Sequence, residues 1–253
     1  MVVPLRPAPL PGPPVAKLRP TALAVDLGSR TVGVWAAHHG TVNDSWSDTA
    51  MPVHRGRVVD LDGCTNQLTR LVGRFPQPLP RGGVVVACRP VLASEADQEA
   101  TRRVLHAVLA PERVIFIDTV RAAAIGSGAA AGSLLVVDIG AELTEVALLT
   151  DGRVHTARRT EIGTRDLDRG ATVDLISDTV RRHIDDLCAG PDPAESATAL
   201  ARGVLLVGDG AVRPDLATAI AGLLQVRVHR ASSPRTAALN GAGLAAMSLL
   251  RHH

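Results

Sequence analysis

Blocks of apolar residues alternate with polar stretches along the chain, and their spacing predicts alternating strands and helices. The runs 83–88 and 203–208 are almost continuously apolar, which is typical of strands buried on both faces of a sheet. Ser94, with Asp97 three residues later, resembles a helix N-cap ahead of apolar residues at helical spacing. We also expect strands at 114–118 and 226–230, strand–turn–strand units at 21–37 and 134–149, helices at 94–109, 120–128, 167–188, 214–225 and 235–250, and a break at 190–196.

The pattern repeats within the chain. Asp26 and Asp138 are 112 positions apart, and the same offset relates Gly28 to Gly140, Gly40 to Gly152 and Val42 to Val154. Downstream, GVVVAC resembles GVLLVG, and the glycines of AAAIGSG match those of AALNGAG: Gly126 with Gly241 and Gly128 with Gly243. Several matches in one order predict a duplicated chain, with similar α/β halves at 21–130 and 131–253.

The amino-acid composition argues against several classes of function. Hydrophobic residues make up 46% and charged residues 21%, as in soluble globular proteins. A net charge of +2, two Trp, two Phe and no Tyr argue against a nucleic-acid partner. Lys17 is the only lysine, which nearly excludes lysine chemistry, and three scattered cysteines without CxxC predict reduced thiols rather than a zinc site. Residues 1–20 hold seven of the 17 prolines, so we expect a disordered tail there.

Each half opens with an apolar strand that ends in Asp-x-Gly. The strand would hold the carboxylate rigidly, and the glycine would let the backbone turn close to a ligand. In the first half, Ser29 and Thr31 add hydroxyl groups after Gly28. Two such turns face to face would place Asp26 and Asp138 around one Mg²⁺, which prefers oxygen ligands and retains waters. The ligand that this pattern indicates is a nucleotide polyphosphate with Mg²⁺.

A third glycine loop follows the strand at 203–208. Gly208-Asp209-Gly210 lies between this strand and a predicted helix, where nucleotides commonly bind in α/β folds. Each loop taken alone is also an ordinary tight turn. Their recurrence at equivalent places in a duplicated chain favours a shared site.

From Thr21 to Leu250 the sequence resembles the actin, Hsp70 and sugar kinase superfamily, and within it the MreB-like bacterial actins. ALAVDLGSRTVGVW resembles the first phosphate loop, LLVVDIGAELTEVALL the second and GVLLVGDGAVRPDL the adenosine loop, while RAAAIGSG and EIGTRDLD resemble further family stretches. The resemblance implies an actin-like (ribonuclease H-like) duplicated fold, with two mixed-sheet halves around a cleft. The segments 40–83 and 168–203 are too short for the usual outer subdomains, which we expect to be largely absent.

The resemblance also implies a site for ATP and Mg²⁺. Its metal ligands would be Asp26 and Asp138. Its nucleotide-binding residues would be Asp26, Gly28, Ser29, Arg30, Thr31, Asp138, Gly140, Gly208, Asp209 and Gly210.

Several positions depart from the family pattern. The family's DIGGGTTE is here DIGAELTE, so Ala141 and Glu142 replace glycines and Glu142 adds negative charge. Arg30 could pair with a phosphate or with Glu142 across an empty cleft. The family's water-positioning glutamate falls on Thr119, which cannot serve as a general base at neutral pH.

These departures predict a degenerate MreB-like protein, a cytoskeletal or scaffold factor in cell shape or cell-wall assembly. It would bind ATP weakly or not at all and hydrolyse little. The alternative is an active Mg²⁺-dependent ATPase or small kinase that uses Asp26 and Asp138. We expect protein partners, such as a full-length MreB relative or cell-wall assembly proteins, and a cytoplasmic location. Membrane association would come through partners, since no apolar run is long enough for a transmembrane helix.

Overall fold

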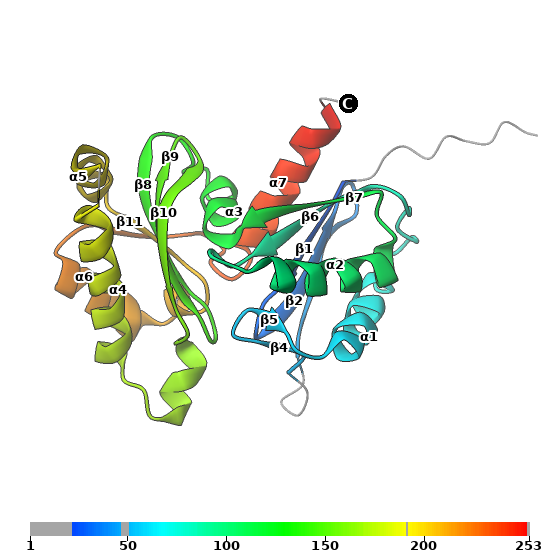
Figure 1. The fold of residues 1–253 in the computed structure, drawn as a ribbon, viewed down its shortest axis with the longest axis horizontal. Coiled ribbons are helices and arrows are strands. Elements are labelled where there is room, and N and C mark those ends of the chain that lie inside the picture. The colour runs from blue at the N-terminus through cyan, green and yellow to red at the C-terminus, as the bar shows by residue number, and fades with distance from the viewer. Residues whose placement is uncertain (1–21, 47–50, 191, 252–253) are drawn as a thin grey trace, which may run out of the picture.

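The computed structural model describes residues 22–46, 51–190 and 192–251, so the predicted tail at 1–20 lies outside the described residues. Two five-stranded mixed sheets lie side by side, each covered by helices on its outer face (Figure 1). The described residues include no helix that is long and apolar enough to cross a membrane.

The first sheet has the strand order β3-β2-β1-β6-β7, in which β1, β2 and β3 are antiparallel and β6 and β7 run parallel to β1. Its outer face is covered by α1 and α2, and the N-cap of α2 is Ser94, as the sequence predicts. The element bounds are β1 Ala22–Leu27, β2 Thr31–Ala36, β3 Gly40–Ser45, α1 Leu61–Val72, β6 Val84–Arg89, α2 Glu95–Leu109 and β7 Arg113–Asp118.

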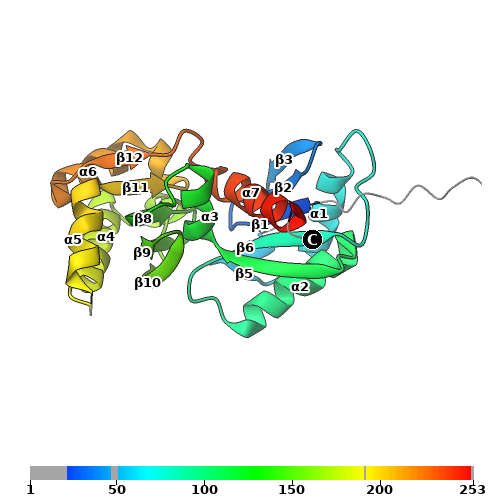
Figure 2. The ribbon, with the colours of Figure 1, turned by 90° about the horizontal axis from the view of Figure 1, so that it is seen from above.

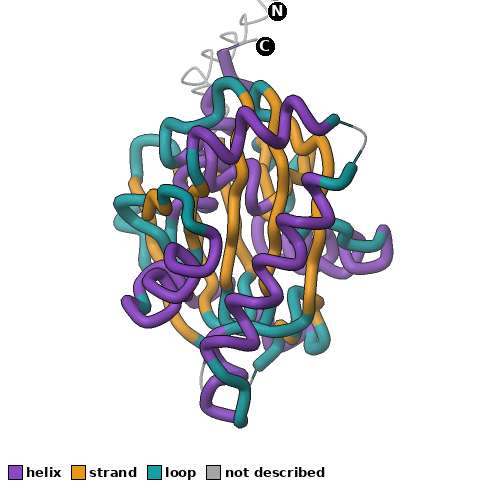
Figure 3. The backbone as a smooth tube through the Cα atoms, turned by 90° about the vertical axis from the view of Figure 1, so that its left-hand side faces the viewer, coloured by secondary structure: helices purple, strands orange, loops and turns teal. Residues whose placement is uncertain are grey.

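The second sheet repeats this topology with the order β10-β9-β8-β11-β12, again three antiparallel strands followed by two parallel ones. Helices α4, α5 and α6 cover its outer face, in front of the strands in Figure 3. The identical strand order confirms the duplicated fold. The bounds are β8 Ser133–Ile139, β9 Thr144–Thr150, β10 Arg153–Thr160, α4 Val173–Cys188, α5 Pro193–Arg202, β11 Val204–Val207, α6 Pro214–Leu224 and β12 Val228–Arg230.

Two helices join the halves. α3 (Thr119–Gly126) follows the first sheet, and α7 (Ala237–Arg251) leaves the second half and packs on β1, β2 and β6 of the first. Figure 2 shows them next to each other at the centre of the molecule. Strand β1 turns small residues, Ala22 and Ala24, toward this helix layer and turns larger residues, Leu23 and Val25, toward α1 and α2. The small inner face lets the helices come close to the sheet.

The helices cross at glycines that match in the repeat. A Cβ atom on Gly241 would lie 1.7 Å from the carbonyl oxygen of Ala122, and one on Gly126 would lie 2.1 Å from that of Ala237. Neither position has room for a side chain, because each glycine faces the backbone of the other helix.

Little chain is inserted into either half. Within the described residues between β3 and α1, the only regular structure is a short hairpin of β4 (Val53–His54) and β5 (Arg57–Val58). In the second half, both α4 and α5 pack on the second sheet and build no separate subdomain. The chain is therefore a shortened actin-like fold with its outer subdomains largely absent.

Two predictions in this region are wrong in detail. The helix expected over 167–188 begins only at Val173, because Gly170 adopts φ +100° after a 3-10 turn (η1, Thr164–Arg169) and Thr172 caps the new helix. The break expected at 190–196 ends earlier, since α5 begins at Pro193. Proline is favoured at the first helical position, where no intrahelical N–H bond is lost.

The crossing of α3 and α7 predicts a strong effect of one methyl group. Gly241→Ala should lower the free energy of unfolding by about 3 kcal/mol or more, because the new Cβ collides with backbone that cannot rotate away. Gly222→Ala in α6 is the matched control, since nothing lies within 4 Å of its Cβ, and it should stabilise by roughly 0.5 kcal/mol. Urea unfolding of both variants measures the difference, and equal stabilities would contradict the close crossing.

Candidate functional site

The three predicted loops meet in one cleft between the halves, a cavity of about 120 Å³, several times the roughly 10–15 Å³ that one water needs. Nine of the ten predicted residues line it: Asp26, Gly28, Ser29, Arg30, Thr31, Asp138, Gly140, Gly208 and Asp209. Gly210 does not line it. A Cβ atom there would lie 2.5 Å from Cβ of Ile139, so Gly210 packs beneath the cleft at the start of the 3-10 turn η2 (Gly210–Val212).

The two strand-end carboxyl groups share the floor of the cleft. Burial raises the pKa of Asp26 to about 6. Burial, followed by the negative charges of Asp26 and Asp209, raises the pKa of Asp138 to about 7. The groups are therefore close enough to repel each other when both are ionised. A divalent cation between them would remove this repulsion, as would protons.

The carboxyl groups of Asp26 and Asp138 are oxygen donors of the kind that Mg²⁺ prefers. No group of three or more His, Cys, Asp or Glu side chains converges into a metal cage among residues 22–46, 51–190 and 192–251. An ion held by Asp26 and Asp138 would thus take its remaining ligands from water and phosphate, which is usual for Mg²⁺ at nucleotide sites.

The glycine loops have equivalent geometry. The amide of Gly28 donates to the carbonyl of Thr31 at 2.9 Å, and that of Gly140 donates to Leu143 at 2.8 Å, which closes the same tight turn in each half. Gly208 adopts φ +79°, and a Cβ atom there would lie 2.2 Å from Oδ1 of Asp138. Only glycine lets the third loop come this close to the carboxylate.

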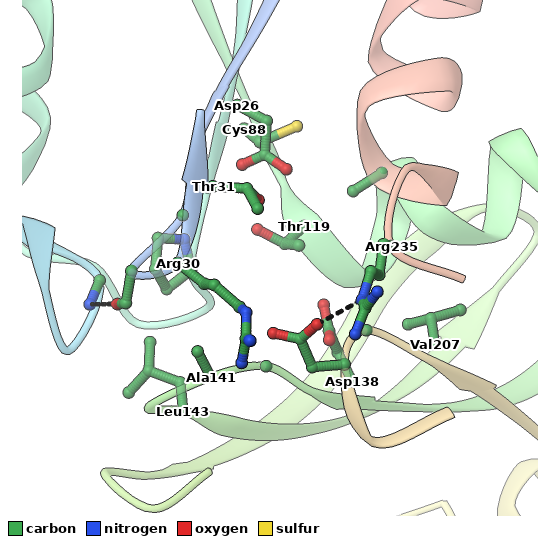
Figure 4. A pocket seen from close by; sticks show the side chains of 18 of the residues that line it. Asp26, Arg30, Thr31, Cys88, Thr119, Asp138, Ala141, Leu143, Val207 and Arg235 are labelled. Atoms are coloured by element: carbon green, nitrogen blue, oxygen red, sulfur yellow. Dashed lines mark hydrogen bonds and ion pairs between the residues drawn. The ribbon is translucent and has the colours of Figure 1, made fainter. Parts of the chain in front are cut away.

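The second loop is partly filled by side chains. Ala141 and Leu143, which are 5% and 7% exposed, point toward the cleft from this loop (Figure 4). Behind them, a Cβ atom on Gly163 would lie 2.5 Å from the backbone of Ala141 and Glu142. The amides of Thr164 and Arg165 also bond to the loop carbonyls. Because the loop is held from behind, it cannot recede to make room for a ligand.

Arg30 and Glu142 do not pair. The Arg30 side chain extends into the space between the loops (Figure 4). The Glu142 carboxylate is fully buried and contacts the β4–β5 hairpin, with its Oε2 atom 3.0 Å from Nδ1 of His54. The Arg30–Glu142 pair across the cleft, one of the two alternatives for Arg30, is therefore not formed.

Thr119 lies at the cleft, where the family resemblance places a water-positioning acid. Its hydroxyl donates to the carbonyl of Arg89 at 2.9 Å. The neighbouring Asp118 accepts from Nε of Arg89 at 2.9 Å and does not line the cleft. Neither residue presents a free carboxylate to an attacking water.

Sequence reasoning missed three groups in the cleft. Glu145 is 4% exposed, and its pKa is raised well above the usual range by burial and by Asp138. It pairs with Asp138 across the hairpin register, so a prediction of that register would have found it. Cys88 ends the strand next to Asp26, and burial together with the surrounding carboxylates raises the pKa of its thiol. Arg235, which pairs with Asp209 at 2.6 Å, carries no sequence signal, because only tertiary folding brings it there.

Two mixed sheets of identical order, two helices crossing between them and a cleft at the matched Asp-x-Gly turns define an actin-like ATPase fold. The family model of the MreB/Mbl protein matches residues 45–185, which is more than half of the chain. The chain belongs to the MreB/Mbl family.

Solved structures show the same fold at low sequence identity. MreB5 of Spiroplasma citri bound to AMPPNP is 14% identical, with a TM-score of 0.76 over 92% of this chain and 98% of that one. The MamK double helical filament is 14% identical, with a TM-score of 0.77 over 90% and 98%. The ethanolamine utilization protein EutJ from Carboxydothermus hydrogenoformans is 18% identical, with a TM-score of 0.64 over 94% and 91%. No curated protein matches the sequence.

The raised pKa of Asp138 predicts an unusual dependence of stability on pH. Between about pH 4 and pH 7 the folded chain keeps a proton that the unfolded chain has lost, so stability should fall as pH rises through this range. Asp138→Asn cannot ionise and should show a smaller decline, while Asp26 and Glu145, whose pKa values are also raised, still contribute theirs. At pH 8, without metal or nucleotide, it should exceed the parent protein by roughly 1–3 kcal/mol.

Urea unfolding at pH 5 and pH 8 measures this effect. The control is Asp178→Asn, which changes an exposed carboxylate on α4 and should behave like the parent protein at both pH values. If Asp138→Asn retains the parent's pH dependence, Asp138 is not a buried and repelled carboxyl group.

Proposed function

We propose that this chain is a degenerate MreB-like protein of cytoskeletal type, which works as a scaffold in cell shape or cell-wall assembly. In this proposal it binds Mg²⁺–ATP weakly or not at all and hydrolyses it little. The observation that carries the proposal is Thr119: at the position of the water-positioning acid stands a hydroxyl that already donates to a backbone carbonyl. A threonine can neither accept the proton of an attacking water at neutral pH nor orient it strongly.

The charge and shape of the cleft support weak binding. The carboxyl groups of Asp26, Asp138, Glu145 and Asp209 line it, and one of its two arginines, Arg235, is already paired with Asp209. A polyphosphate entering this cleft would meet carboxylates at short range, with a repulsion of roughly 4 kcal/mol per close pair at 4 Å. The side chains in the second loop also leave less room than glycines would.

The proposed nucleotide site still has identifiable parts. Asp26 and Asp138 would hold Mg²⁺. The bound Mg²⁺ would neutralise phosphate charge. The turn Gly28–Thr31 would face the phosphates, with the hydroxyls of Ser29 and Thr31 as donors and Arg30 as the cation. Gly140 and the loop Gly208-Asp209-Gly210 would bound the site from the second half. Asp209 would remain turned to Arg235, and Gly210 would serve only as packing against Ile139.

In this role the chain would act through surfaces that bind other proteins. The proposed halves, residues 21–130 and 131–253, exchange helices α3 and α7, and this exchange would hold them together as one rigid body. With outer subdomains largely absent, other surfaces are left to meet protein partners, such as a full-length MreB relative or cell-wall assembly proteins. We place the protein in the cytoplasm, with membrane association only through such partners and no role in nucleic-acid binding.

A second candidate function is an active Mg²⁺-dependent ATPase. The specific observation in its favour is that Asp26 and Asp138 share one cleft floor and repel each other, which a divalent cation would relieve. The two candidates differ in affinity and turnover, so one titration and one phosphate-release assay separate them.

Calorimetric titration with Mg²⁺–ATP should give a Kd of about 100 µM or weaker, or no heat at all. If binding is detected, Asp26→Asn should weaken it about tenfold. The amide has nearly the size of the carboxylate but lacks the negative charge that would hold the metal. Asp178→Asn, the exposed control, should leave binding unchanged. Binding near 1 µM that Asp26→Asn abolishes, with steady phosphate release, would instead establish the ATPase.

A further inference from the structure

The short hairpin of the first half reaches the second half at the edge of the cleft, which Gly56 lines. Its turn is formed by Arg55 and Gly56, both at positive φ, 49° and 72°. A Cβ atom on Gly56 would lie 2.7 Å from both Leu143 of the second loop and Pro90 of the first half. The Gly56 amide also donates to Oγ of Ser29 at 3.2 Å. The tip is therefore wedged between the two phosphate-type loops.

Arg55 makes most of its polar contacts with the other half. Its amide donates to Oε2 of Glu142 at 2.9 Å, and its guanidinium donates to the carbonyl of Glu142 at 3.3 Å and to the carbonyl of Glu161. Its Nη2 atom lies 3.1 Å from Oδ1 of Asp166. The Arg55 and Asp166 side chains are only 20% and 14% exposed, so solvent screens this pair weakly.

Glu142 depends on the hairpin for its direct hydrogen bonds. The side chain is fully buried, and its Oε2 atom meets His54 and the Arg55 amide. Its Oε1 atom has no hydrogen-bond partner among the described residues, and the nearest cations are Arg165 at 3.6 Å and Arg169 at 3.8 Å. A buried carboxylate without partners is costly, but one that returns to water is not. Glu142 is therefore stable either under the hairpin or in an open cleft.

A second connection lies beside the hairpin. The amide of Val91, in the loop after β6, donates to Oε1 of Glu145 at 2.5 Å, and Arg159 donates to the Val91 carbonyl at 3.1 Å. Farther out, Arg57 pairs with Glu161 at 2.8 Å, although both side chains are more than 40% exposed. The first half thus contacts the second on the side of the cleft away from the α3–α7 crossing.

We propose that the hairpin Val53–Val58 is a latch that holds the two halves closed over the cleft without a nucleotide, mainly through Arg55 and its contacts with Glu142 and Asp166. This deepens the proposed function, because a scaffold with a weak nucleotide site needs another means to keep its halves in one arrangement. Entry of a ligand would require the latch to open, so the latch also limits access to the site.

Cys88 provides a direct test. It lies on the cleft floor, 7% exposed, so its alkylation reports opening. Cys64 is fully buried in the outer core of the first half and reports unfolding, while the half-buried Cys188 reports reagent activity. The full-length protein would be treated with iodoacetamide without nucleotide or metal, and the rate at each cysteine followed by mass spectrometry. The result therefore does not depend on whether the cleft binds ATP.

Arg55→Ala should raise the alkylation rate of Cys88 at least tenfold and leave Cys64 protected. The matched control is Arg181→Ala, which removes an exposed ion pair with Asp185 on α4 and should change neither rate. An unchanged Cys88 rate in a folded Arg55→Ala protein would overturn the latch.

A milder variant covers the case in which Arg55→Ala also exposes Cys64. Arg57→Ala removes the outer ion pair with Glu161 and a longer one, 4.0 Å, with Asp97 of its own half, and it should keep the fold. It should raise the Cys88 rate about two- to fivefold with Cys64 unchanged. If the Cys88 rate does not rise in this variant either, the hairpin does not hold the cleft closed.

Discussion

The structure depends on the contact between the backbones of α3 and α7. The two helices are equivalent elements of the repeat, and the glycines that match in sequence, Gly126 and Gly241, face each other where the helices cross. Each half therefore supplies the surface on which the other half's helix packs. This explains why the inner face of β1 carries alanines, while the outer face carries leucine and valine. A larger inner residue would lift α7 from the sheet and separate the halves.

The position of this crossing also brings the carboxyl groups of the cleft together. It brings together the corresponding ends of β1 and β8, the central strands of the two sheets. The aspartates near these ends, Asp26 and Asp138, therefore share one cleft floor. Each strand alone would present its carboxylate to water. Burial raises the pKa of both groups, and the negative charge of Asp26 raises that of Asp138 further. The acidic floor is thus a consequence of duplication and helix exchange, and it exists whether or not a ligand uses it.

Much of this was predictable from the sequence because it is local or repeated. The Asp-x-Gly turns, the Ser94 cap and the buried central strands follow from residue type and spacing, and the repeat predicted that Asp26 and Asp138 would lie in one cleft. The remainder depended on tertiary contacts. Arg235 reaches Asp209 only because the chain returns before α7. Gly210 lies beneath the cleft because Ile139 occupies the space beside it. The start of α4 depends on the φ angle of Gly170, and glycine identity alone does not fix that angle.

Glu142 shows most clearly that a sequence comparison can identify a substitution without revealing which contacts the new side chain makes. Replacement of a loop glycine by glutamate suggested repulsion of phosphate. In the folded chain the carboxylate instead turns to the hairpin, where Arg55 and His54 bind it. The same substitution that makes the loop less suited to phosphate provides an anchor for the first half. With the outer subdomains largely absent, such side-chain contacts are what remain to join the halves on the side opposite the helix crossing. Changes at the nucleotide loop and at the hairpin are therefore best understood together, as parts of one interface.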